Sequence, residues 1–292
     1  HARDDSSSWF LNACSVIIGV NPASYKTQHW ARKYRSNFGI SLPATLRIWL
    51  DLEHTGEISR NQLLWTLNFL QTYPVESVGC VRFGITEKTY RLWVWKGIRL
   101  IGKLNYIKFE DRFENWNRLC PSFSLDGTDL WIQEQGTFDK KDMSHKFKHA
   151  GLRYEVGVAL GSSKIIHVAG GVPCGTWPDI RLARQCLVPK LLPGEKPSAD
   201  KGYRDGRQHF FTPIDNPSNA FDRRVNRCLK LIQARHETVN KRLKDFLILN
   251  GRFRHSRTQH AEVFFACAIL TQCKLAEDPL PDVRQMLFNN CI

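Results

Sequence analysis

The stretch Leu152–Leu160, LRYEVGVAL, decides the fold class of this chain. Its apolar residues alternate with charged or small ones, and a period of two is typical of a β-strand with one buried face. A second apolar run, Lys164–Ala169, follows after a Gly-Ser-Ser segment, and this order predicts a β-hairpin. The middle of the chain is therefore expected to form part of a sheet.

Downstream of this hairpin, helical and strand patterns alternate. Residues 178–188 are typical of a helix with proline near its first turn, and residues 196–199 form a short strand that ends at Asp200. A long helix is predicted over residues 221–249. Strands mixed with helices favour an α/β domain with a mixed sheet and flanking helices.

Residues up to about 115 are mainly helical in pattern. Residues 44–52 and 61–70 repeat apolar side chains at three- and four-residue steps. A short helix, a glycine turn and a second helix over residues 78–100 give the outline of a helix-turn-helix, although any helical hairpin has the same outline. We therefore predict a helical N-terminal region over residues 1–118 and a catalytic domain over residues 119–292.

The charge of the chain is strongly basic and is concentrated in one region. Lys and Arg outnumber Asp and Glu by 42 to 28. Residues 201–260 contain 14 Lys or Arg against 5 Asp or Glu, so +9 of the net +14 lies in one fifth of the chain. Such a distribution favours a polyanionic partner such as DNA, with a solvated basic surface as the plainer alternative.

Other features narrow the class of protein. The longest apolar run, Val263–Leu270, is far shorter than the roughly 20 residues of a membrane helix, which predicts that no membrane is involved. The nine cysteines contain no C-x-x-C pair, which favours reduced thiols inside a cell. No signal peptide is evident, and because the chain begins at His1, a further segment can precede it.

Three acidic residues are candidates for a catalytic site. Asp126 follows a short apolar and serine stretch and precedes Gly127, so a turn aspartate is the local alternative. Asp200 directly follows a predicted strand, where Asp-Lys-Gly is also typical of a turn. Glu237 lies on the long helix on a face that it shares with lysines, where an ion pair with Lys241 is the alternative.

Taken together, the three acids supply the parts that a two-metal site for phosphoryl transfer needs. Two carboxylates at strand ends and one on a helix are the hard oxygen ligands that Mg²⁺ or Mn²⁺ prefers. Two such ions, roughly 3.5–4 Å apart, activate the attacking oxygen and stabilise the leaving oxygen in phosphoryl transfer. Asp126, Asp200 and Glu237 are thus predicted to bind two metal ions.

Four motifs resemble the DDE transposases of the IS5 and PIF/Harbinger type, from about residue 30 to the C-terminus, and occur in the family's order. They are LDGT at Leu125–Thr128, GVPCGTWPD at Gly171–Asp179, ADKGY at Ala199–Tyr203 and RHETVNKRLK at Arg235–Lys244. The resemblance implies a ribonuclease H-like fold, with the first acid on the central strand, the second after a later strand and the third on a helix across the sheet.

The resemblance also implies roles for single residues. Asp126, Asp200 and Glu237 correspond to the metal-binding triad. The second motif departs from the family pattern, since it reads Pro-Cys-Gly and has Pro178 before its acid, so Asp179 is expected to support the site and not to bind metal directly. Arg235 is expected to contact a phosphate or to brace the structure.

The predicted reaction is cleavage of a DNA phosphodiester by water activated between the three acids, followed by attack of the new 3′-hydroxyl on target DNA. Sequence choice would come from the N-terminal helices or from a separate DNA-binding protein, and a homodimer fits such a reaction. Nuclear location is expected in a eukaryote, and cytoplasmic location with DNA otherwise. The basic residues expected to contact the DNA backbone are Lys201, Lys241, Lys244, Arg252, Arg254 and Arg257.

Two alternatives share the same residues. One is a domesticated DDE nuclease that cuts DNA without joining it. The other is a DNA-binding derivative that has kept the fold but not the chemistry.

Overall fold

The computed structural model describes residues 2–116, 121–134, 136–137 and 139–291. The chain forms two compact units. Unit 1 comprises residues 1–104, 243–251 and 262–274, and unit 2 comprises residues 105–242, 252–261 and 275–292. Unit 1 is helical and unit 2 contains the sheet, so the predicted combination of a helical N-terminal region with an α/β domain is confirmed. The predicted boundary between residues 118 and 119 lies outside the described residues.

Several helices of unit 1 begin at a capping side chain, namely Thr27, Ser41, Ser59 and Thr86. Ser59 accepts a hydrogen bond from the backbone of Gln62, whose side chain bonds back to Ser59, and this capping box begins α4. The predicted helices over residues 44–52 and 61–70 correspond to α3 and α4. The elements of unit 1 are α1 (Ala2–Ile18), α2 (Gln28–Phe38), α3 (Leu42–Glu53), α4 (Arg60–Thr72), α5 (Glu76–Phe83), α6 (Glu87–Gly102), α9 (Leu247–Asn250) and much of α10 (Arg257–Glu277).

The predicted helix, glycine turn and helix over residues 78–100 correspond to α5 and α6. Gly84 ends α5 with a φ of +65°, a left-handed conformation in which a Cβ is unfavourable. The hydroxyl of Thr86 then accepts a hydrogen bond from the backbone of Thr89 and begins α6. The helix-turn-helix outline is therefore present, and its contact with DNA stays a prediction.

Gly97 sets how closely α4 and α6 pack. A Cβ at Gly97 would lie 2.1 Å from Thr66 Oγ1 and 3.0 Å from Thr66 Cβ. We expect Gly97→Ala to lower the free energy of unfolding by about 1–3 kcal/mol, because two helix backbones must separate. Gly102→Ala on the same helix is the control, since its Cβ would meet nothing closer than 3.8 Å. Equal urea midpoints for the two variants would contradict this account of the packing.

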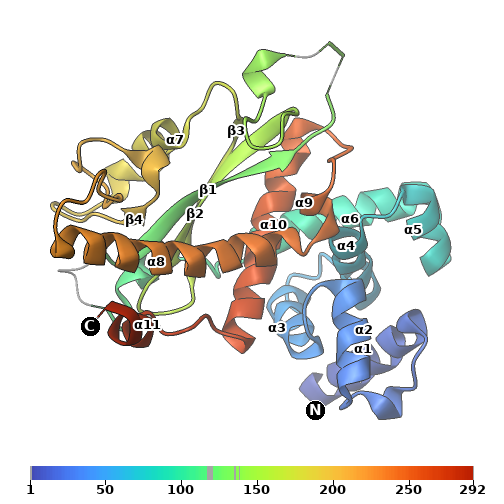
Figure 1. Cartoon of the computed structure of the whole chain (residues 1–292). Coiled ribbons are helices and arrows are strands. Elements are labelled where there is room, and N and C mark those ends of the chain that lie inside the picture. The colour runs from blue at the N-terminus through green and yellow to red at the C-terminus, as the bar shows by residue number, and fades with distance from the viewer. Residues whose placement is uncertain (1, 117–120, 135, 138, 292) are drawn as a thin grey trace. The chain divides into compact units, whose positions relative to one another are not determined.

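The sheet of unit 2 has four strands in the order β3-β2-β1-β4 (Figure 1). β1 pairs antiparallel with β2, β2 pairs antiparallel with β3, and β4 runs parallel to β1, so the sheet is mixed as predicted. The strands are β1 (Phe123–Trp131), β2 (Gly151–Ala159), β3 (Ile165–Pro173) and β4 (Ser198–Ala199). The predicted hairpin over residues 152–169 is confirmed as β2 and β3.

The expectation that the 152–160 strand buries only one face was wrong. Every residue of β2 is buried, including Arg153 and Glu155. The alternating pattern suggested a solvent-exposed face because the side chains of Arg153 and Glu155 are charged. Both are instead covered and paired within the protein, Arg153 with Asp129 and Glu155 with His167.

One face of the sheet packs against α7 (Asp179–Cys186), and α8 (Ala220–Lys244) lies across the sheet (Figure 1). The residues of the core on the α7 side are Phe123, Leu125, Ala159, Ile166, Ala183, Leu187, Ala199, Tyr203 and Phe210. Ser124 of β1 points the other way, and its hydroxyl lies 2.7 Å from His236 Nδ1 on α8. The sheet thus has helices on both faces.

The single long helix predicted over residues 221–249 is interrupted. α8 ends at Lys244, and α9 begins at Leu247. Phe246 between them has an extended backbone and a fully buried ring. The ring fills the space above Gly39, where a Cβ would lie 2.3 Å from Phe246 Cε1. Burial of this ring between distant segments accounts for a break that local helical periodicity did not indicate.

Candidate functional site

Asp126 lies in the middle of β1, so both the turn interpretation and the strand-end placement were wrong. It stands opposite Val156 of β2, and Gly127 stands opposite Glu155. Because side chains alternate along a strand, Asp126 shares a face with Ser124, and Gly127 shares the other with Asp129. At Asp126–Gly127, β1 therefore carries a carboxylate on one face of the sheet and no side chain on the other.

The carboxylate of Asp126 is partly buried and held by two hydrogen bonds. Oδ1 accepts from the N–H of Gly127 at 2.8 Å, and Oδ2 accepts from Asn240 Nδ2 on α8 at 2.8 Å. Burial raises its pKa to about 7, against the opposing effect of the Lys146 charge, and the negative charge of Asp200 raises it further. The folded chain thus holds a carboxylate that a nearby cation would stabilise.

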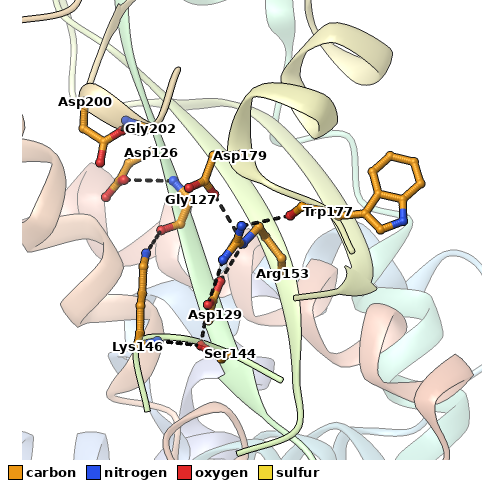
Figure 2. Close-up of polar contacts among 10 residues, drawn as sticks. All are labelled: Asp126, Gly127, Asp129, Ser144, Lys146, Arg153, Trp177, Asp179, Asp200 and Gly202. Carbon is orange, nitrogen blue, oxygen red and sulfur yellow. Dashed lines mark hydrogen bonds and ion pairs between the residues drawn. The ribbon is translucent and has the colours of Figure 1, made fainter. Parts of the chain in front are cut away.

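Asp200 comes next to Asp126 because of strand pairing. β4 runs parallel to β1, with Ala199 opposite Leu125, so one further residue along both strands brings the two aspartates together (Figure 2). Oδ1 of Asp200 accepts from the N–H of Gly202 at 2.8 Å and caps the short 3₁₀ helix Lys201–Tyr203. The turn predicted at this position is present, and it fixes the Asp200 carboxylate at the edge of the sheet.

Asp179, at the first turn of α7, is a third member of this group. A Cβ at Gly127 would lie 2.1 Å from its Oδ1, and a Cβ at Gly202 would lie 3.2 Å from its Oδ2 and 3.0 Å from Asp200 Oδ1. Two glycines therefore leave the space that Asp179 occupies between β1 and the turn after β4. Burial raises the pKa of Asp179, and the charge of Asp200 adds to this.

An ion-pair network connects Asp179 to the sheet (Figure 2). Arg153 donates from Nε and Nη2 to the two carboxylate oxygens of Asp129, at 2.8 and 3.0 Å. Its Nη1 donates to the carbonyl of Trp177 at 2.8 Å, and Nε lies 3.3 Å from Asp179 Oδ1. Burial alone would raise the pKa of Asp129, but hydrogen bonds from Arg153 and Ser144 lower it overall. Arg153 thereby fixes both the start of α7 and the position of Asp179.

Glu237 lies on α8 next to the helix face that contacts β1. His236 and Asn240, four residues apart, contact Ser124 and Asp126, which are two residues apart on the strand. Glu237 is exposed, one turn before Asn240. Among the described residues, no hydrogen bond or ion pair links it to Asp126 or Asp200. The structure brings the two aspartates together and places Glu237 on the adjacent, exposed helix face.

His236 lies on the buried side of α8, next to Ser124 of β1. It is fully buried, and burial lowers its pKa to about 3, so it packs as a neutral ring. Arg235 beside it is also buried and donates to the carbonyls of Pro281, Ala159 and Ser162. Of the two expected roles of Arg235, the structural brace is correct.

The six basic residues expected to contact DNA differ in their surroundings. Lys201 is exposed but lies 3.0 Å from the carboxylate of Asp215. Arg257 is half-buried and makes a two-pronged ion pair with Asp142. The other four are exposed or half-exposed, and they are Lys241 and Lys244 on α8 and Arg252 and Arg254 in the segment that follows α9.

Two residues near the acids were not indicated by the sequence. Asn240 holds Asp126, and its Oδ1 is buried without a hydrogen-bond partner among the described residues. Lys146 donates from Nζ to the carbonyl of Gly127 at 3.0 Å. Asn240 lies within the RHETVNKRLK motif, one helical turn after Glu237, but the motif did not indicate its contact with Asp126. Lys146 lies in an irregular segment between β1 and β2, where no periodicity could indicate it.

Within the described parts of the chain, no three His, Cys, Asp or Glu side chains form a ready-made metal-binding group. None of the described helices combines the length and the apolar composition needed to cross a bilayer. The seven cysteines whose side chains are described are free thiols. Comparison of the chain with family models, with curated proteins and with solved structures found no match.

Proposed function

We propose that this protein is a metal-dependent DNA endonuclease of the DDE type, similar to the IS5 and PIF/Harbinger transposases, on a ribonuclease H-like fold. The observation that carries the proposal is that Asp126, within β1, and Asp200, directly after β4, lie next to each other on neighbouring strands. The two residues are 74 positions apart in the chain, and each belongs to a separate motif that resembles the family. Asp179 joins them from a third element.

The order of the elements supports the proposed fold. The first acid lies on β1, a central strand that pairs with β2 and β4. The second follows β4, and the third proposed acid, Glu237, lies on α8, which packs on β1 through His236 and Asn240. This is the arrangement that the family resemblance implies. A four-stranded mixed sheet with a helix on each face is compatible with it.

The chemistry of the carboxylate group suits divalent cations, although the described side chains do not form a ready-made three-ligand site without them. Asp126, Asp179 and Asp200 offer only carboxylate oxygens, which are the donors that Mg²⁺ and Mn²⁺ prefer. Burial and mutual repulsion raise the pKa of Asp126 and of Asp179, and a bound cation relieves both effects. Asp126 and Asp200 would hold the ions, with Glu237 as the ligand from α8. Bound in this way, the ions would supply activation of a water molecule and stabilisation of the leaving oxygen.

The protein itself would position the DNA. Lys241, Arg252 and Arg254 are exposed and can contact backbone phosphates, so binding should weaken steeply with salt and carry little sequence information. Asn240 would keep the Asp126 carboxylate in one orientation while the phosphodiester is cleaved. The choice of DNA sequence would come from the helices of unit 1 or from a separate DNA-binding protein.

The test is cleavage of duplex DNA from the genomic flanks of the gene. Wild type should nick it in Mg²⁺ or Mn²⁺ and not in EDTA, and Asp200→Asn should not nick. Equal nicking by wild type and Asp200→Asn would exclude this site. Cleavage without joined products in a strand-transfer assay would favour a nuclease that does not transpose. Binding without cleavage would favour a DNA-binding derivative.

A further inference from the structure

Lys146 reaches the group formed by the carboxylates of Asp126, Asp179 and Asp200 from the segment between β1 and β2, which is anchored through Asp142 and Ser144. Its Nζ donates to the carbonyl of Gly127, the residue that follows Asp126 in β1 (Figure 2). Its positive charge acts on three carboxyl groups, those of Asp126, Asp129 and Asp179. An ammonium group therefore lies in the field of the carboxylates at which the proposed chemistry would occur.

The backbone of Lys146 is held in place by hydrogen bonds of the segment between β1 and β2. Ser144 Oγ donates to Asp129 Oδ2 at 2.6 Å and accepts from the backbone N–H of Lys146 at 3.2 Å. Asp142, on the same segment, is held by Arg257. The Asp129 that anchors Ser144 is itself held by Arg153. The same network that places Asp179 thus also places Lys146.

The surroundings of Lys146 leave room for a ligand. Within the described structure, its ammonium group makes one hydrogen bond, although it carries three N–H donors. The residue is exposed, so a ligand can reach its side chain from solvent. If cations are bound at Asp126, an anion that binds to them would also meet the positive charge of Lys146, which lies beside the Gly127 carbonyl. A phosphate has the negative oxygens that such a donor prefers.

We propose that Lys146 is a further catalytic residue, whose ammonium group contacts a non-bridging oxygen of the scissile phosphate. The inference rests on the proposed nuclease function and deepens it. The residue transfers no proton and forms no covalent bond. It stabilises the negative charge that grows on the phosphate as the attacking and leaving oxygens are both partly bonded.

The first experiment compares Lys146→Gln, Lys146→Arg and Lys141→Gln, a matched loss of charge from an exposed lysine on the same segment. At saturating DNA, Lys146→Gln should lower the single-turnover nicking rate about 10²–10³-fold. Lys146→Arg should stay within about tenfold of wild type, because it keeps the charge. The Kd for DNA in Ca²⁺ and the Tm should change little in all three.

The second experiment separates contact with phosphate from a structural role. One non-bridging oxygen of the scissile phosphate is replaced by sulfur, in each stereoisomer, and the rates form a double cycle with Lys146→Gln. For one stereoisomer, the sulfur substitution should lower the nicking rate of wild type by a factor at least about threefold larger than the factor for Lys146→Gln. The reason is that Lys146→Gln has already lost the contact with this oxygen. Factors that multiply independently in both stereoisomers would overturn the proposal.

Other outcomes are equally decisive. If wild type nicks and Lys146→Gln is no slower than Lys141→Gln, Lys146 has no catalytic role and the nuclease stands. If Lys146→Gln and Lys146→Arg both lose activity together with Tm, the residue is only a brace for Gly127. If wild type does not nick at all, the proposed function and this inference both fail.

Discussion

Asp126→Asn is expected to abolish cleavage and to stabilise the metal-free protein. The nicking rate should fall by at least about 10³-fold, as for the loss of a central group in other active sites. In EDTA at pH 8, the free energy of unfolding should rise by on the order of 2 kcal/mol, because burial penalises the charged carboxylate but not a neutral amide, which is also not repelled by Asp200 and Asp179. Loss of function with gain of stability is typical of a site built for a ligand.

The pH dependence of this gain follows from the direction of the pKa shift. The pKa of Asp126 is raised from 3.8 to about 7 in the folded protein, so the folded state holds the proton more tightly than the unfolded state. Its contribution to stability is greatest below pH 4 and is lost as the pH rises to about 7. The advantage of Asp126→Asn should therefore be small at pH 4 and should grow to a plateau above pH 7.

Urea unfolding in EDTA between pH 4 and pH 8 measures this difference, with Mg²⁺ added in a second series. Asp215→Asn is the control of opposite sign, because the pKa of Asp215 is lowered, chiefly by its hydrogen bond from Lys201. It should not stabilise the protein at any of these pH values. Added Mg²⁺ should raise the Tm of wild type and not of Asp126→Asn. If the free energy of unfolding of Asp126→Asn in EDTA at pH 8 is lower than that of wild type, the account of Asp126 is contradicted.

Local sequence patterns predicted most helices and strands of unit 2, because the pattern that favours each element lies within its own consecutive residues. The β2–β3 hairpin, α7, β4 and most of α8 follow from periodicity, glycine turns and prolines. The predictions were wrong where contacts between residues far apart in the sequence determine the local backbone conformation. Phe246 breaks the long helix to bury its ring, and Asp126–Gly127 continues a strand where the dipeptide indicates a turn.

The candidate site was predictable in part for the same reason. The motifs singled out Asp126, Asp200 and Glu237, but the adjacency of the two aspartates depends on parallel pairing of β1 with β4. Asn240 contacts Asp126 across 114 residues of sequence, and no local pattern could indicate that. The metal-binding role of all three acids, and the contacts of the basic residues with DNA, stay predictions.

Arg153→Met is expected to have the largest effect on stability. The Asp129 side chain is only 1% exposed, and its two oxygens face the guanidinium of Arg153. Removing the cation leaves a buried carboxylate uncompensated, which lowers the free energy of unfolding by about 3–5 kcal/mol. Arg181→Met is the control, since Arg181 is exposed and lies over the Trp177 ring, and it should change the free energy by less than about 1 kcal/mol.

The double variant Asp129→Leu with Arg153→Met separates folding from function. Because well-packed apolar side chains can replace a buried ion pair, urea unfolding should recover much of the lost stability. Mg²⁺ should nevertheless fail to raise its Tm as it does for wild type, since Asp179 has lost its only arginine partner among the described residues and Ser144 its anchor. A double variant with wild-type response to Mg²⁺ would mean that the network serves only folding. Failure of the response with recovered stability would mean that the buried ion pair is retained to position the acids.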